Sequence, residues 1–205
     1  MLTAMVKPKP LNEERSFNIE ELFFSRTDLR GIILAGNEVF VRISNHPLDK
    51  LIGAPHNIIR HPDMPKSVFK ILWDTLKLGK VIAAYVKNMA ADGKYYWVLA
   101  VVFPVGEEYL SIRLKPSSPL KAAVEEIYKG VLAEEKANGM DASLALLVNS
   151  IAKAGFKSYD DFMTTALLSE LKSRDQVLTA RLSEKNENLS PMLLKIADIS
   201  KKSAQ

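Results

Sequence analysis

The chain has 205 residues, of which 47% are hydrophobic and 25% charged, with a formal net charge of +4 and no cysteine. These values are ordinary for a globular protein and exclude a disulfide framework and thiolate metal sites. The absence of cysteine suits the reducing cytoplasm, which is the location we expect. We expect no membrane span and no nucleic-acid binding, because the sequence has neither an apolar run of about 18 residues nor a basic run.

The composition changes near residue 116. Residues 20–116 hold most of the aromatic and β-branched side chains, whereas residues 117–205 contain alanine, leucine, glutamate and lysine in helical periods. The joint between them, KPSSP at 115–119, is typical of a linker. We therefore predict a mobile N-terminal segment over 1–19, a folded domain over 20–116 and a separate helical region over 117–205.

Short elements are predicted in the first half of the folded domain. Residues 31–36, GIILAG, form an apolar run between glycines and indicate a buried strand. Residues 37–44 follow as a helix with Asn37 at its N-cap. Residues 65–79 indicate a longer helix, because proline suits its first turn, apolar residues recur at helical spacing and Gly79 suits its end.

Three strands are predicted in the second half of the domain. Residues 81–90 and 94–105 are joined by an Asp-Gly pair, which favours a tight hairpin turn. Residues 94–105 are apolar on both faces and predict a central strand, whose second face is covered by the N-terminal segment, a second subunit or the C-terminal helices. Residues 109–115 alternate, with one face formed by Leu110, Ile112 and Leu114 and the other by Ser111 and Arg113.

This order of elements predicts an α+β domain, in which a five-stranded antiparallel sheet carries helices across one face, followed by an all-α tail. A pocket between the sheet and the helices is the natural ligand site in this layout. In the tail, residues 120–131 fit either a coiled-coil linker or one packed amphipathic helix. Ser158 and Asp161 form a capping arrangement at the start of a further helix.

The most distinctive stretch is HNIIRHPDMP, residues 56–65, which holds two of the three histidines. Their spacing and the proline after the second argue against a helical metal site, and no nucleophile motif accompanies an acid/base pair. We therefore expect no metal site and no enzymatic activity. The stretch fits a loop that His61 stabilises and in which Asp63 caps the next helix. Arg60 differs, because its planar guanidinium is suited to bind phosphate or carboxylate.

The chain resembles the PAS domain of bacterial aerotaxis receptors. The resemblance spans residues 22–118, and PHNIIRHPDMP is its most specific string. It is carried in order by residues 27–44, 51–80, 86–88, 95–98 and 109–117. The resemblance implies a PAS fold that holds FAD non-covalently and senses oxygen or redox state. It also implies a signal to a chemoreceptor-type partner or output domain.

The same resemblance implies a set of cofactor-binding residues. Arg60 and His61 correspond to an arginine–histidine pair of the flavin pocket, and Asp63 to an aspartate that supports their loop. Phe69 and Trp73 lie on the long helix, where Trp73 fits either ring stacking or core packing.

Two asparagines complete the predicted site. Asn37 and Asn88 correspond to pocket asparagines, whose amides both donate and accept hydrogen bonds. Asn88 also shares strand parity with apolar residues such as Val86, and a buried amide needs a partner.

The chain departs from the family pattern at two places. Ile82 stands where the family usually has a tryptophan, which weakens the case for stacking on the flavin ring. Residues 89–91 replace a basic stretch, which weakens the case for binding of the pyrophosphate. FAD is the expected ligand, with FMN, haem, another small molecule or no ligand as alternatives. The alternative function is a cofactor-free PAS interaction module that mediates protein assembly.

We also expect a homodimer, because the apolar strand 94–105 and the leucine-rich tail present more apolar surface than one solvated helix needs. It would form through the helical tail and the N-terminal cover of the sheet. The alternative is a tail that packs within the same chain.

Overall fold

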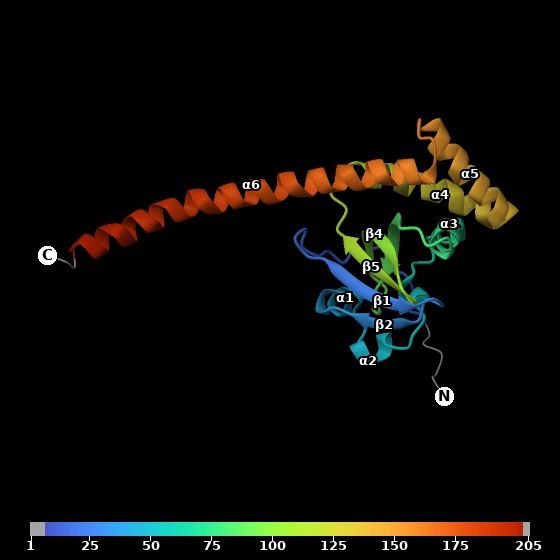
Figure 1. Ribbon diagram of the computed structural model, residues 1–205, viewed down its shortest axis with the longest axis horizontal. Helices are drawn as coiled ribbons and strands as arrows, with labels where there is room; N and C mark the ends of the chain where they lie inside the picture. The colour runs from blue at the N-terminus through green and yellow to red at the C-terminus, as the bar shows by residue number, and fades with distance from the viewer. Residues whose placement is uncertain (1–6, 203–205) are drawn as a thin grey trace.

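The computed structural model describes residues 7–202, with side chains as far as residue 183. Figure 1 shows a sheet-based domain beneath three C-terminal helices, the last of which continues well beyond the domain. The predictions made for residues 1–6 and 203–205 lie outside the described residues. Within the described part of the chain, none of the helices combines the length and the apolar composition that a bilayer span requires.

The domain is built on a five-stranded antiparallel sheet, as the sequence predicts. Its spatial order is β2-β1-β5-β4-β3. β4 lies inside the sheet, paired with β3 and β5, although β5 rather than β4 is the central strand. The strands are β1 (Phe23–Asp28), β2 (Ile33–Gly36), β3 (Ile82–Met89), β4 (Tyr95–Val105) and β5 (Glu108–Leu114).

Short helices follow β2 and cover the inner face of the sheet. The predicted N-cap is confirmed, because Asn37 Oδ1 accepts a hydrogen bond from the Phe40 amide at 3.1 Å. The helices are α1 (Glu38–Ser44), α2 (Leu48–Leu51), the 3-10 helix η1 (His56–Ile59) and α3 (Lys66–Lys77).

The cap predicted for α3 is wrong. Asp63 makes no hydrogen bond to the first turn of α3, and its carboxylate instead accepts one from Lys87 Nζ at 2.7 Å. The first amides of α3, those of Lys66 and Ser67, donate to Glu135 Oε2 at 2.7 and 3.3 Å. Because Glu135 belongs to the C-terminal region, the tail supplies the negative charge that the helix N-terminus favours.

The C-terminal helices are α4 (Leu120–Asn138), α5 (Met140–Lys153) and α6 (Tyr159–Lys202). Helix α4 and the first part of α6 pack on the outer face of the sheet, whereas α5 packs against α4 and α3. Val124, Tyr128 and Val131 of α4 are buried, and the Tyr128 hydroxyl donates to the Tyr85 carbonyl of β3 at 3.1 Å. Of the two alternatives for residues 120–131, the structure therefore has the packed amphipathic helix. The capping arrangement is confirmed, since Ser158 Oγ accepts from the Asp161 amide at 3.1 Å.

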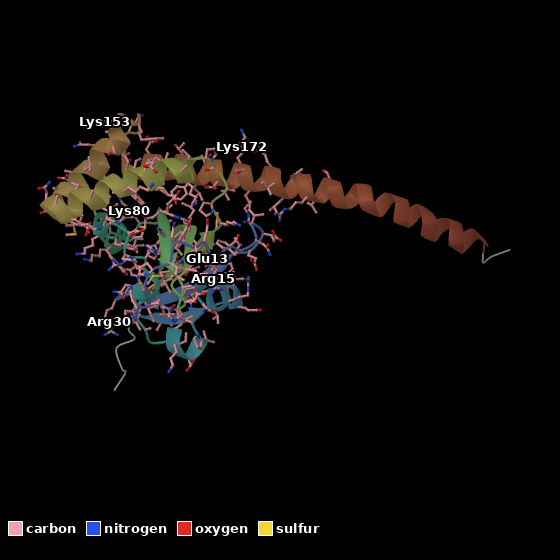
Figure 2. The ribbon with its side chains drawn as sticks, turned by 180° about the vertical axis from the view of Figure 1, so that it is seen from behind. Glu13, Arg15, Arg30, Lys80, Lys153 and Lys172 are labelled. Carbon is pink, nitrogen blue, oxygen red and sulfur yellow. The ribbon has the colours of Figure 1, made fainter. Side chains whose placement is uncertain are left out.

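The N-terminal segment fills the remaining free edge of β4. The first residues of β4 extend past the end of β5, and there the Tyr95 amide and carbonyl bond to Glu13 and Arg15 at 3.0 and 2.7 Å. Glu13 and Arg15 lie next to each other on this side of the domain (Figure 2). Gly93 permits the close approach, because a Cβ atom there would lie 2.4 Å from the Lys9 carbonyl oxygen.

Candidate functional site

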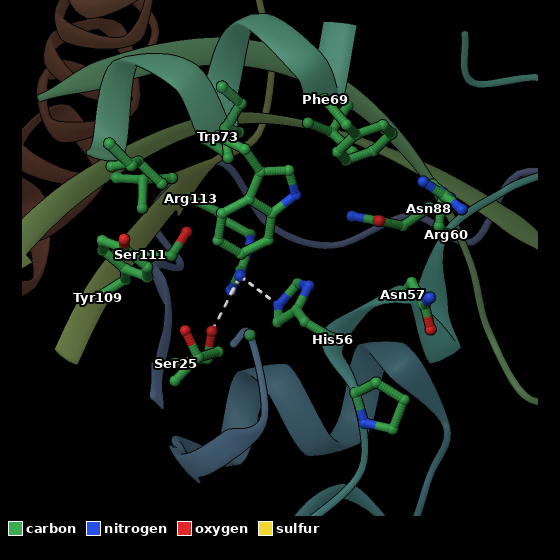
Figure 3. A pocket seen from close by; sticks show the side chains of 18 of the residues that line it. Ser25, His56, Asn57, Arg60, Phe69, Trp73, Asn88, Tyr109, Ser111 and Arg113 are labelled. Carbon is green, nitrogen blue, oxygen red and sulfur yellow. Dashed lines mark hydrogen bonds between the residues drawn. The ribbon is translucent and has the colours of Figure 1, made fainter. Parts of the chain in front are cut away.

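A cavity of about 290 Å³ lies between the inner face of the sheet, helix α3 and the loop that carries η1 (Figure 3). This is the position that the layout of the sequence predicts. Of the seven predicted cofactor-binding residues, the structure brings four to the cavity wall, namely Arg60, Phe69, Trp73 and Asn88.

Helix α3 forms one wall with four side chains at helical spacing, Phe69, Leu72, Trp73 and Leu76. The Trp73 indole is only partly buried and meets the Tyr109 ring edge-on, with 5.8 Å between centroids. Gly31 makes room for it, because its φ is +81° and a Cβ atom there would lie 3.0 Å from Trp73 Cη2. Trp73 therefore presents an aromatic surface to the cavity.

Asn88 reaches the cavity from β3. Its predicted parity is confirmed, because Val86 and Asn88 both line the cavity from the inner face. Asn88 is only 3% exposed as a residue, it lines the cavity, and no hydrogen bond within the described residues uses its side-chain amide. An amide in this position needs a polar partner, so this group is available to a ligand.

Arg60 lies beside Asn88. Their backbones form an isolated β-bridge, and the Arg60 guanidinium lies over the Phe69 ring, 4.9 Å from its centroid. Stacking on a ring fixes the plane of the guanidinium, which leaves its edge free to bind an anionic or carbonyl group.

Sequence reasoning missed a second polar group, which is centred on Arg113 of β5. The Arg113 side chain is buried, and its Nη2 donates to Ser25 Oγ at 2.9 Å and lies 2.6 Å from His56 Nε2. Within the described residues, Arg113 Nη1 and Ser111 Oγ are buried and have no hydrogen-bond partner. Figure 3 shows the Arg113 guanidinium between Ser25 and His56, with Asn88 and Arg60 toward the other side of the cavity.

The charges of this group follow from its burial. Burial and, second, the positive charge of Arg113 lower the pKa of His56 to about 3, so the imidazole is neutral at neutral pH. A neutral Nε2 atom can accept the Arg113 hydrogen bond. Burial lowers the pKa of Arg113 to about 10, which leaves the guanidinium charged.

One signal in the sequence pointed to this group. The alternation in β5 places Ser111 and Arg113 on one face, but it does not say which face points inward. The register places Ser25 of β1 directly opposite Ser111, so polar residues of two adjacent strands meet on the inner face.

The other three predicted residues do not line the cavity. The Asn37 amide is used by the backbone, because Oδ1 accepts from the Phe24 and Phe40 amides and Nδ2 donates to the Leu22 carbonyl. His61 Nδ1 accepts from the Asp63 amide at 3.1 Å. His61 and Asp63 thus stabilise the loop that carries Arg60.

A second polar cluster joins the domain to its tail. Glu170 of α6 is 1% exposed, and its Oε2 accepts from the Ser117 and Ser118 amides at 2.5 and 2.8 Å. Its Oε1 accepts from the Ser118 hydroxyl at 2.7 Å and from the Tyr85 hydroxyl at 2.8 Å. One buried carboxylate therefore connects β3, the joint at 115–119 and α6.

Comparison with known proteins agrees with this architecture. Residues 33–112 match the family model of the PAS fold. Over 114 residues the chain is 43% identical to the aerotaxis receptor of Escherichia coli K12, a match that covers 53% of this chain and 22% of that receptor.

Two solved structures are also similar. A light-oxygen-voltage domain from a study of a flavin analogue is 17% identical with a TM-score of 0.47, over 54% of this chain and 88% of that one. The blue-light activated histidine kinase of Erythrobacter litoralis EL346 is 12% identical with a TM-score of 0.45, over 60% of this chain and 42% of that one.

The antiparallel sheet order, the helices across its inner face and the family match define the sheet-based domain as a PAS domain. Its sequence is similar to that of the aerotaxis receptor, as the stretch around residues 56–65 predicted.

Proposed function

We propose that this protein is a cytoplasmic signal-transduction sensor rather than an enzyme. In this proposal its PAS domain binds a flavin, FAD in particular, and senses redox state or oxygen. The observation that carries the proposal is the inner cavity, where an aromatic wall faces buried polar groups that the described residues leave without partners. The match to the aerotaxis receptor supports the same class of function.

The residues of the cavity fit a flavin. Small-molecule pockets span about 300–1,000 Å³, so a cavity of about 290 Å³ suits a fused ring system with the rest of a dinucleotide outside. Trp73 would face the ring, Asn88 would bond its polar edge, and Arg60 lies where the chain of the cofactor would leave the cavity. Arg30 also lies at the rim, where its exposed guanidinium is paired with the Asp28 carboxylate at 2.9 Å.

A bound flavin supplies reversible electron transfer, in which protonation of N5 turns a hydrogen-bond acceptor into a donor. The Asn88 amide can serve both states, because rotation exchanges its carbonyl oxygen for its amino group. Asn88 is the cavity residue best suited to detect the change.

We propose that the tail receives the signal through β3. Tyr85 lies three residues from Asn88 on this strand, and its hydroxyl bonds to Glu170 on the outer face. A shift of β3 therefore changes the hydrogen bonds by which Glu170 holds Ser117 and Ser118. The recipient would be a chemoreceptor-type partner or output domain. A homodimer through α6 is part of this proposal, because Leu168, Leu171 and Leu182 are exposed on that helix.

A PAS interaction module without a cofactor is the second candidate. Ile82, which stands where the family usually has a tryptophan, is buried in a cluster with Leu72, Leu76, Val102 and Tyr109. These apolar contacts stabilise that end of the cavity without a ligand.

The spectrum of the purified protein separates the two candidates. We expect the absorption bands of an oxidised flavin and the release of FAD on heat denaturation. Asn88→Ala should lower the flavin content per folded protein, whereas Val105→Ala, on an exposed residue, should leave it unchanged. A folded, colourless wild type that takes up no added FAD would favour the interaction module.

A further inference from the structure

The inner end of the cavity holds a buried cation without a counter-ion. Arg113 is 3% exposed, and it forms no ion pair within the described residues. A buried charge is costly unless an opposite charge or several hydrogen bonds compensate it. Nη2 has two partners, whereas Nη1 has none among the residues whose side chains the structure describes.

The neighbours of Arg113 do not supply the missing negative charge. Ser25 is uncharged, and His56 is neutral because burial and, second, the positive charge of Arg113 lower its pKa. The Phe40 ring lies 5.4 Å from the guanidinium carbon. Burial raises the pKa of Tyr96 above its usual range, so this phenol is neutral, and its hydroxyl also has no partner among the described residues.

The unused donors belong to residues that line the cavity. Arg113 and Ser111 both line it, and Arg113 Nη1 and Ser111 Oγ are among the buried atoms that the described residues leave unbonded. Asn88 and Arg60 lie toward the other side (Figure 3), so a ring system in the cavity would meet a different polar group at each side.

We propose that Arg113, with Ser111, binds a negatively charged or carbonyl-rich edge of the ligand. This inference rests on the proposed function, in which the ligand is a flavin. The edge is then the N1 and C2=O side of the flavin ring. Reduction by two electrons from a donor such as dithionite, with one proton taken up from the solvent, places the proton on N5 and one negative charge on this edge. Arg113 stabilises that charge, so it raises the reduction potential of the bound flavin.

A redox titration of the loaded protein tests this role. Arg113→Met should lower the equilibrium constant for reduction about 10- to 100-fold, which for a two-electron couple is about 30 mV for each factor of ten. Arg113→Lys should recover part of the loss, because it keeps the charge. Arg26→Met is the matched control, since it also removes one positive charge but lies on an exposed position of β1.

A second pair of variants leaves Arg113 in place. His56→Glu puts a carboxylate beside the guanidinium and should lower the potential, whereas the neutral His56→Gln should lower it much less. This pair decides the matter if Arg113→Met does not fold. The inference would be wrong if the bound flavin had the same reduction potential in wild type and Arg113→Met, or the same potential in His56→Glu and His56→Gln. The proposed function would still stand in that case. A wild type that binds no flavin would overturn the proposed function as well.

Discussion

The Tyr85 hydroxyl donates a hydrogen bond of 2.8 Å to Glu170, and this bond connects the strand that carries Asn88 to the longest helix of the tail. Glu170 has no cationic partner within the described residues. Its charge is compensated by hydrogen bonds from Tyr85, Ser117 and Ser118. Each of these hydrogen bonds offsets part of the cost of burying the carboxylate.

Glu170→Ala should therefore destabilise the protein by about 3–5 kcal/mol, because it leaves buried donors without an acceptor. Tyr85→Phe removes one of several bonds and should cost about 1–3 kcal/mol. Chemical denaturation measures both. Docking of the tail can be followed by Trp97, which packs against Tyr128, in a Trp73→Phe background. Equal stability of wild type and Glu170→Ala would show that the cluster does not hold the tail.

Asn88→Leu should separate ligand binding from stability. The flavin content should fall, because the amide that faces the cavity is lost. The unliganded protein should keep its free energy of unfolding or gain about 1–2 kcal/mol, because an unbonded buried amide is replaced by an apolar side chain. Heat-released flavin and urea denaturation of the unliganded protein give the two quantities. A large loss of stability would mean that Asn88 has a structural partner.

Gly31 and Gly53 form a matched pair for testing the position of Trp73. Both have positive φ, +81° and +79°, but a Cβ atom meets Trp73 at Gly31 and nothing within 4 Å at Gly53. Alanine at either position should cost about 1–2 kcal/mol of backbone strain. Only Gly31→Ala should also displace the Trp73 indole. A lower flavin content and an altered Trp73 fluorescence, measured in a Trp97→Phe background, would report this displacement. Identical ligand binding by the two variants would contradict this role.

His61 makes stability depend on pH. Burial and, second, the positive charge of Lys87 lower its pKa from 6.5 to about 4 in the folded protein. Below pH 6.5 the unfolded chain therefore binds a proton that the folded chain does not. The stability contributed by neutral His61 is complete above pH 6.5 and is lost as the pH falls toward 4.

We expect this loss to be about 1–3 kcal/mol for His61, from about 1.4 kcal/mol per pKa unit. Urea denaturation between pH 4 and 7 measures it. His61→Asn keeps an acceptor near the Asp63 amide but does not titrate, so its stability should fall less over this range. His56, whose pKa is lowered further, should account for much of the remaining dependence. Parallel curves for wild type and His61→Asn would exclude the assignment.

Much of the fold could be predicted because its signals are local. The order of strands and helices, the Asn37 cap and the inward parity of Asn88 all follow from neighbouring residues. The inward direction of Arg113 could not be predicted, because alternation defines two faces and only the strand order decides which one the helices cover. The same limit explains Asp63, which suits a helix cap locally but binds Lys87 of a distant strand.

The contacts of the tail were also beyond local reasoning. Glu135 and Glu170 lie in helical sequences where a glutamate normally faces solvent. Their partners in α3 and in the joint at 115–119 are more than 50 residues away in the sequence, as the separations of 69 and 53 residues show. Only the folded chain reveals that these two carboxylates accept hydrogen bonds from backbone amides of α3 and of the joint at 115–119.

Glu135 and Glu170 attach the tail to two opposite walls of the cavity, to α3 through Lys66 and to β3 through Tyr85. Thermodynamic linkage makes such a connection reciprocal. If a ligand in the cavity changes the equilibrium constant for tail docking by some factor, then docking of the tail changes the affinity of the cavity for that ligand by the same factor. Under the proposed function, a partner that binds the tail helices therefore also changes the ligand concentration to which the cavity responds. The sensitivity of the proposed sensor would then depend on that partner as well as on the cavity.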